Sequence, residues 1–227
     1  MAGIGFKLRT MANRGDIASA TQAYGYSLFL VAGPWIFTVL ALLGITFALR
    51  PTTSWTEIQN FRSVIIYNFC FTLILTGPIV LAGTRYVADQ IYKKDLTYIP
   101  FALTASLGVV AGLTLIFAST FYYAFVDLPV ELLTMAVMNF GLAAAIWVAA
   151  PFLSIVKDYR SIALAFAVGC LVAVTMAITF AEYLDDTRIL LIFNITLFGV
   201  LAAILFRIFE EYPVALKIDP AWLDFLK

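Results

Sequence analysis

The sequence contains no histidine, only two cysteines and few charged residues. Because histidine is the commonest general base and a frequent metal ligand, its absence removes the usual starting points for hydrolytic and metal chemistry. Cys70 and Cys170 each lie within an apolar run, and they fit neither a disulfide framework nor a metal site. We therefore expect both cysteines to be buried packing residues, and we expect no cofactor.

Charged residues make up 12 % of the chain and apolar residues 63 %, with a mean hydropathy of +0.98. A soluble globular domain has about 25 % charged and about 45–50 % apolar residues. This chain has too little polar surface to cover a water-soluble globule, so lipid must surround most of it. The composition indicates an integral membrane protein.

Long apolar stretches recur along the chain, separated by short polar or turn-rich segments. Each has roughly 20 or more residues, enough at about 1.5 Å per residue to cross a hydrocarbon layer of about 30 Å. Because lipid leaves no partner for free backbone groups, such segments form helices rather than open strands. The sequence thus predicts an all-α integral membrane protein with a bundle of six transmembrane helices. The predicted spans are Tyr24–Leu49, Phe61–Tyr86, Pro100–Val126, Pro129–Val156, Ile162–Leu184 and Ile189–Phe209.

Lysine and arginine are unevenly divided between the two ends of this predicted bundle. The end that holds both chain termini carries eleven: Lys7, Arg9, Arg14, Arg85, Lys93, Lys94, Lys157, Arg160, Arg207, Lys217 and Lys227. The other end carries only Arg50, Arg62 and Arg188. Since basic loops remain in the cytoplasm, both termini are predicted to be cytoplasmic. We expect residues 1–23 to form an amphipathic segment on the cytoplasmic surface, or else a flexible lead-in, and residues 210–227 to form a cytoplasmic linker or tail.

Three asparagines lie within the spans that run from outside to inside. Asn68, Asn139 and Asn194 each follow an outer charged residue by six to eight positions. This spacing places them roughly 9–12 Å below the outer helix ends. If these helix faces converge, the asparagines form one polar layer and are candidates for a translocation path. The alternative is that each amide simply hydrogen-bonds a neighbouring helix.

Two Gly-Pro pairs, Gly33-Pro34 and Gly77-Pro78, lie in the inner halves of the first and second spans. Proline removes a backbone donor and clashes with the preceding turn, while glycine permits bending or close packing. Facing kinks at a related depth are candidates for a gating hinge, with static bends as the alternative.

Arg85 and Asp89 lie four residues apart near the inner end of the second span, so they share a helix face and can pair. They are candidates for a cytoplasmic gate or mouth, and the alternative is an interfacial anchor with a neutralising partner. The chain has no phosphate-binding loop, no nucleotide fingerprint and no metal-ligand pattern. We therefore expect neither enzymatic activity nor nucleic-acid binding.

Several motifs in roughly the first 90 residues resemble those of the PelG family, the inner-membrane transporter of the Pel exopolysaccharide. The segments are Met1-Ala2-Gly3-Ile4-Gly5-Phe6-Lys7-Leu8-Arg9, Gln22-Ala23-Tyr24-Gly25-Tyr26, Gly33-Pro34-Trp35, Thr76-Gly77-Pro78 and Thr84-Arg85-Tyr86-Val87-Ala88-Asp89. The later spans agree with that family in number and spacing only.

This resemblance implies a polysaccharide transporter of the flippase superfamily, which includes O-antigen flippases and multidrug exporters. It implies two six-helix bundles around a central cavity, alternating access, and a place in the bacterial inner membrane of biofilm-forming cells. Implied partners are a polysaccharide substrate, membrane lipid, other polysaccharide-synthesis membrane proteins and a cytosolic glycosyltransferase. With six spans, the chain is expected to be an N-terminal half that needs a second half, a truncated product or a half-size protein that forms a homodimer. A non-transporting membrane scaffold of a synthesis complex and a small-solute exporter remain alternatives.

Overall fold

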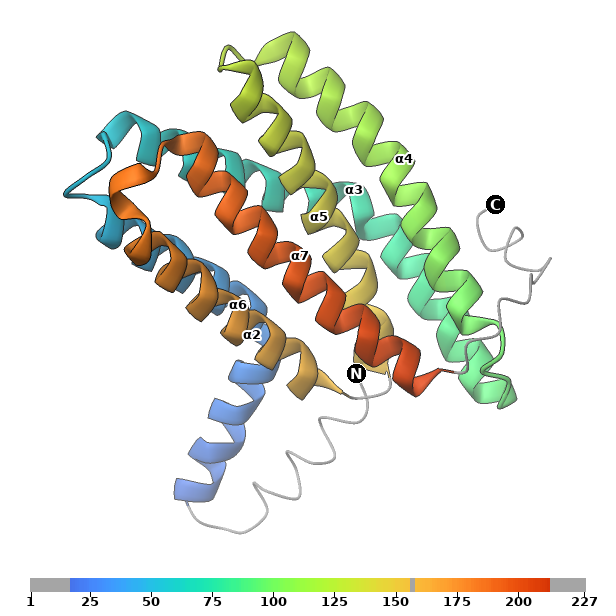
Figure 1. The fold of residues 1–227 in the computed structure, drawn as a ribbon. Helices are drawn as coiled ribbons and strands as arrows, with labels where there is room; N and C mark the ends of the chain where they lie inside the picture. The colour runs from blue at the N-terminus through green and yellow to red at the C-terminus, as the bar shows by residue number, and fades with distance from the viewer. Residues whose placement is uncertain (1–16, 156–157, 213–227) are drawn as a thin grey trace.

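The computed structural model describes residues 17–155 and 158–212, and within these residues all regular secondary structure is helical (Figure 1). Six helices in this described part of the chain are long and apolar enough to cross a membrane. The prediction of an all-α bundle with six membrane spans is confirmed. The elements are α2 (Ile17–Leu49), α3 (Trp55–Lys93), α4 (Ile99–Phe125), α5 (Val130–Ile155), α6 (Tyr159–Thr179), the 3₁₀ turn η1 (Ala181–Tyr183) and α7 (Asp186–Glu211).

Helix α3 extends beyond its predicted span, Phe61–Tyr86, at both ends. Helix α3 begins at Trp55 because Ser54 and Glu57 form a capping box, with each side chain bound to the backbone N–H of the other. It ends at Lys93, where Lys94 adopts a left-handed conformation with φ of 60°. The predicted fifth span was too long, since α6 ends at Thr179 and η1 follows it.

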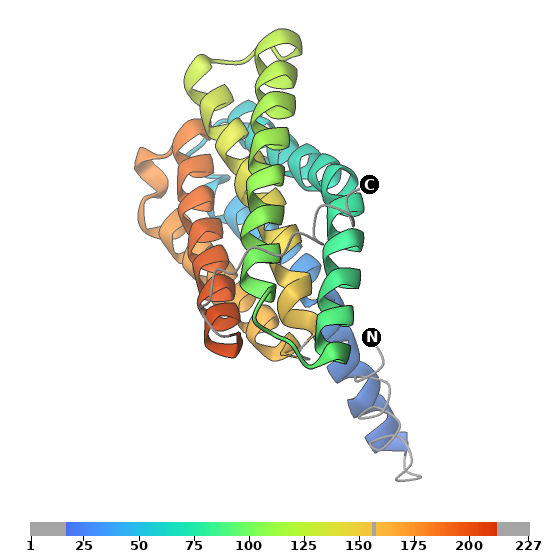
Figure 2. The same cartoon turned by 90° about the vertical axis from the view of Figure 1, so that its right-hand side faces the viewer.

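Helix α5 lies at the centre of the bundle and packs against α3, α4 and α7 (Figures 1 and 2). Helix α2 packs mainly against α6 and contacts α3, its neighbour in sequence, only sparsely. Helix α6 in turn packs against α7. The spatial order α2–α6–α7–α5, with α3 and α4 on the far side of α5, therefore departs from the order along the chain.

Small residues permit the close approach between these helices. A Cβ atom on Gly44 of α2 would lie 2.7 Å from a methyl carbon of Val174 in α6. A Cβ atom on Gly169 of α6 would lie 2.7 Å from a methyl carbon of Val200 in α7. Lipid supplies no hydrophobic driving force between helices, so such close van der Waals packing is a main source of their association.

Both intrahelical Gly-Pro pairs lie inside continuous helices, because α2 contains Pro34 and α3 contains Pro78. Figure 1 shows that α3 changes direction along its length, as expected where proline breaks the backbone ladder. A Cβ atom on Gly77 would meet nothing within 4 Å, so close packing does not require glycine there. The role of these pairs as a hinge stays a prediction.

The two cysteines and the two terminal segments were each given a role from the sequence. Cys70 is exposed and Cys170 half-buried, so the expectation that both are buried was wrong. An apolar run in a membrane protein does not separate helix-facing from lipid-facing positions, because both environments are apolar. Residues 1–16 of the predicted surface segment and residues 213–227 of the predicted tail lie outside the described residues. Helix α2 includes the rest of that predicted surface segment, from Ile17 onward.

Candidate functional site

The three predicted asparagines meet in one chain of hydrogen bonds, in the half of the bundle that the charge distribution predicts to be outer. The Asn68 Nδ2 of α3 donates to the Asn139 Oδ1 of α5 at 2.9 Å, and the Asn139 Nδ2 donates to the Asn194 Oδ1 of α7 at 2.8 Å. All three side chains are at most 1 % exposed. We call Asn68, Asn139 and Asn194 the asparagine ladder.

Backbone carbonyls of α5 bind both ends of the asparagine ladder. The Asn68 Nδ2 also donates to the Ala136 carbonyl at 2.9 Å, and the Asn194 Nδ2 donates to the Met135 carbonyl at 2.9 Å. These carbonyls belong to consecutive residues on the turn of α5 that precedes Asn139, so the amides of α3 and α7 bind the same turn. The ladder therefore cross-links α3, α5 and α7.

A fourth helix joins the asparagine ladder through Tyr122, near the outer end of α4. Its hydroxyl donates to the Asn68 Oδ1 at 2.5 Å, and the side chain is buried. Tyr122 was not among the site residues predicted from the sequence. The available signal was that Tyr122 lies just inside the outer end of a span, at the depth of an asparagine that needs a donor.

In this conformation the asparagine ladder lies in helix contacts. A hydrogen bond between membrane helices contributes about 0.6 kcal/mol on average and up to about 1.7 kcal/mol. The convergence of the three faces agrees with the predicted polar layer, while the pairing of the amides corresponds to the structural alternative. The role of the ladder in a translocation path stays a prediction.

An aromatic cluster joins α2 to α3 and α5. The rings of Trp35 and Trp147 lie 5.3 Å apart between centroids, and Phe69 packs edge-on against both, at 6.4 and 5.9 Å. Within the described part of the chain, the buried Nε1 of Trp147 has no hydrogen-bond partner. Trp35 directly follows Pro34, so this ring contact between α2 and α3 is made next to a proline.

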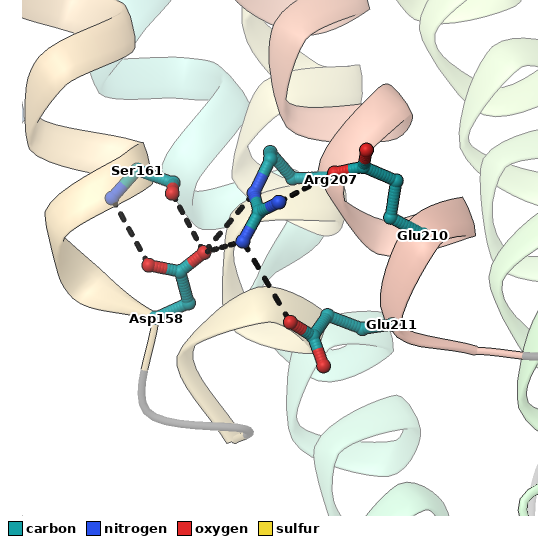
Figure 3. Close-up of polar contacts among 5 residues, drawn as sticks. All are labelled: Asp158, Ser161, Arg207, Glu210 and Glu211. Carbon is teal, nitrogen blue, oxygen red and sulfur yellow. Dashed lines mark hydrogen bonds and ion pairs between the residues drawn. The ribbon is translucent and has the colours of Figure 1, made fainter.

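A cluster of charged side chains connects the inner ends of α6 and α7 (Figure 3). The Arg207 guanidinium lies at its centre, with Nη2 3.1 Å from the Asp158 Oδ2 and 3.7 Å from the Glu211 Oε1. Arg207 also pairs with Glu210, one turn along the same helix. Asp158 caps α6 by accepting from the Ser161 backbone N–H at 3.2 Å. From the sequence, Arg207 was predicted only as one of the cytoplasmic charges, and these partners were not predicted.

The electrostatics of this inner cluster favour the charged form of Asp158. Partial burial by itself raises the pKa of the Asp158 carboxyl. Hydrogen bonds from Ser161 and Arg207, together with the positive charge of Arg207, outweigh burial and hold that pKa below its usual value. The cluster is therefore an ionic connection between two helices that are far apart in sequence.

Arg85 and Asp89, the predicted pair at the cytoplasmic mouth, are both exposed near the inner end of α3. Within residues 17–155 and 158–212, no ion pair joins them. The i, i+4 spacing allows them to pair, but an exposed ion pair gains little over two solvated charges. Their role at a gate stays a prediction.

Comparison with known proteins gave one family match. The family model described as PelG, "Putative exopolysaccharide Exporter (EPS-E)", matches residues 1–227. Searches of curated proteins and of solved structures gave no match. The match extends over all six helices, well beyond the motifs of the first two spans.

Proposed function

The chain belongs to the PelG family of exopolysaccharide exporters, and on that premise we propose that it moves exopolysaccharide across the bacterial inner membrane. The proposed mechanism is flippase-like alternating access without covalent chemistry, in which the chain is not an enzyme. The observation that carries the proposal is the family match over residues 1–227 of a chain with six membrane helices.

Two structural features support movement within this proposal. Helix α2 packs mainly on α6 and contacts α3 only sparsely, and Trp35, which follows Pro34, packs on Phe69 of α3 and Trp147 of α5. The asparagine ladder instead holds α3, α5 and α7 together through amide hydrogen bonds. We propose that α2 and α6 move against the α3–α5–α7 group, so that the ladder becomes accessible to the polymer in another state of the cycle.

We propose that the exporter acts within a larger assembly. Its other half would be a second six-helix bundle, from the same polypeptide or from a second copy. Other polysaccharide-synthesis membrane proteins and a cytosolic glycosyltransferase would deliver the growing polymer to the cytoplasmic end. Arg85 and Asp89 lie exposed at the predicted cytoplasmic end and are proposed contacts for that delivery.

Removal of the gene tests the proposed function. Extracellular polysaccharide should fall to background, while polymer accumulates inside the cells, and expression of the intact protein should restore secretion. Unchanged secretion in the deletion strain would contradict the proposal. Unchanged secretion with reduced drug tolerance would indicate a small-solute exporter instead.

The asparagine ladder provides the second test. Replacement of Asn68, Asn139 and Asn194 together by leucine should abolish secretion while the protein remains in the membrane on immunoblots. The matched control is Thr175→Leu, since Thr175 is exposed on α6 and its hydroxyl donates to the Leu171 carbonyl of its own helix. Normal secretion by the triple variant would exclude a path through the ladder.

A membrane scaffold is the second candidate function, because the three amides are paired within helix contacts. A scaffold that only anchors the synthesis complex predicts loss of polymer both inside and outside the deletion strain. An exporter predicts polymer accumulation inside. Measurement of intracellular polymer therefore separates the two candidates.

A further inference from the structure

A cavity of about 380 Å³ lies between the outer parts of α3 and α4. Its α3 side is a stripe of one helix face that includes Asn60, Ser63, Tyr67 and Phe71, three or four residues apart. Its α4 side includes Phe121 and Tyr122. We call this cavity the outer aromatic pocket. Its volume falls in the range of about 300–1,000 Å³ that is typical of small-ligand sites.

The α3 stripe combines aromatic rings with hydrogen-bonding groups. The rings of Tyr67 and Phe71 are stacked with centroids 6.3 Å apart, and Phe71 lies 5.8 Å from Phe121. Among the described residues, the hydroxyls of Ser63 and Tyr67 have no hydrogen-bond partner. The Asn60 Nδ2 donates to the Asp186 Oδ2 at 3.1 Å, which fixes the amide and leaves its Oδ1 free to accept from a ligand.

This combination selects among ligand classes. An acyl chain makes no hydrogen bonds, so it would leave the two hydroxyls and the amide oxygen unpaired. A phosphate group requires cationic donors, and no lysine or arginine is among the described residues that line the pocket. A sugar ring presents C–H faces that pack on aromatic rings and hydroxyl edges that pair with hydroxyl and amide groups.

We propose that the outer aromatic pocket binds a saccharide unit of the exported polymer, with Tyr67 and Phe71 as the stacking surface and Ser63 and Asn60 as hydrogen-bonding partners. This inference rests on the proposed export function. The pocket extends along α3 from Asn60, at the predicted outer end, to Phe71, one turn below the level of Asn68, so it would hold the polymer in the outer half of the membrane.

Tyr122 couples the pocket to the asparagine ladder. Its side chain lines the pocket, and its hydroxyl donates to the Asn68 Oδ1 at 2.5 Å. A saccharide that displaces or recruits this hydroxyl changes the hydrogen bonding of Asn68. Saccharide binding in the pocket therefore alters the hydrogen bonds of the asparagine ladder, which connect α3 to α5 and α7.

Direct binding tests the proposal on the full chain in lipid nanodiscs free of sugar-based detergent. The probe is the oligosaccharide mixture released by mild acid hydrolysis from the total exopolysaccharide of the cells that produce the protein. We expect Tyr67→Ala to weaken binding about tenfold, through loss of both ring and hydroxyl, and Tyr67→Phe to weaken it about threefold. Isothermal titration measures the affinities.

The matched control is Phe125→Ala, because Phe125 is an aromatic residue near the outer end of α4 that is 78 % exposed and does not line the pocket. It should bind as the intact protein does. A second variant, Ser63→Trp, fills the pocket from an exposed position and should abolish binding without removal of any core side chain. Size-exclusion elution confirms that each variant is folded.

The outcomes separate this proposal from the export function. Loss of secretion on gene deletion, with normal saccharide binding by Tyr67→Ala and Ser63→Trp, would overturn the pocket and leave the export function intact. Absence of any binding to the intact protein would overturn the pocket as well. Unchanged secretion on deletion, with binding lost in both variants, would overturn the export function and leave the saccharide site.

Discussion

At the residue scale, the polar side chains inside the bundle are those with the strictest requirements. An amide within the membrane must find both donors and acceptors in the protein, because no water is present to supply them. Asn139 is the only ladder member that both accepts from one asparagine and donates to another. If the central amide is removed, Asn194 retains its bond to the Met135 carbonyl, and Asn68 retains its bonds to the Ala136 carbonyl and the Tyr122 hydroxyl.

Asn139→Leu should therefore destabilise the protein by about 1–3 kcal/mol. The substitution removes two hydrogen bonds and leaves the Asn194 Oδ1 buried without its donor. Thermal unfolding in nanodiscs measures the effect. Thr175→Leu, on the exposed face of α6, should change stability by less than about 0.5 kcal/mol. Equal stability of the two variants would contradict a structural role for the ladder.

At the element scale, the glycine contacts decide how closely α6 approaches its neighbours. Gly169→Ala should cost about 1–3 kcal/mol, because the new Cβ would lie 2.7 Å from the Val200 Cγ2 and 3.3 Å from the Thr196 Cγ2. Both neighbours are β-branched, so rotation about χ1 relieves little of the overlap. Gly108→Ala is the matched control, since a Cβ there would meet nothing within 4 Å. If Gly169→Ala and Gly108→Ala unfold at the same temperature, the α6–α7 contact accommodates the added methyl group, and close packing at Gly169 does not contribute to stability.

The inner ends of α6 and α7 are connected by the ionic cluster at Asp158. Because the pKa of Asp158 is lowered in the folded protein, its contribution to stability is present above the ordinary aspartate pKa of about 3.9. That contribution disappears as the pH falls through the lower, folded-state pKa. Above that range the carboxylate is charged in both the folded and the unfolded protein.

Asp158→Asn should remove this acid-dependent part of stability. Asparagine still caps a helix, so the substitution isolates the charge of Asp158 from its capping role. The effect should be small, because the Arg207 side chain is 39 % exposed and solvent screens the pair. Thermal unfolding between pH 3 and pH 7 checks it, and equal acid dependence of the two proteins would exclude Asp158 as the titrating group.

At the scale of the whole molecule, the six helices alternate in direction, so the start of α2 and the end of α7 lie at the same end of the bundle (Figure 1). The charge distribution predicts that this end is cytoplasmic. Lys94 and Asp127 are exposed in loops at opposite ends and make suitable reporters.

Cysteine labelling in intact cells tests this orientation. In a protein with Cys70 and Cys170 replaced by alanine, Asp127→Cys should react with a membrane-impermeant maleimide. Lys94→Cys should react only after the cells are lysed. The reverse pattern would place the start of α2 and the end of α7 outside the cell and overturn the positive-inside prediction.

Local chemistry alone determined a large part of this protein. Span number and depth follow from helix rise and hydrophobic thickness, so the six helices and the shared level of Asn68, Asn139 and Asn194 were predictable. The PelG motifs of the first two spans identified the family that the match over residues 1–227 shows. None of these inferences requires knowledge of which helices are neighbours.

Only the tertiary structure decided which faces meet. In lipid the buried and exposed faces of a helix are both apolar, so hydrophobic periodicity does not reveal them. The packing of α2 on α6, the exposure of Cys70 and the Tyr122–Asn68 bond therefore could not be predicted from the spans. The partners of Arg207 were hidden for a related reason, since Asp158 lies 49 residues away and only the α6–α7 contact brings the two charges together. The sequence determined which segments span the membrane, and the packing of the helices determined which partners each polar side chain contacts.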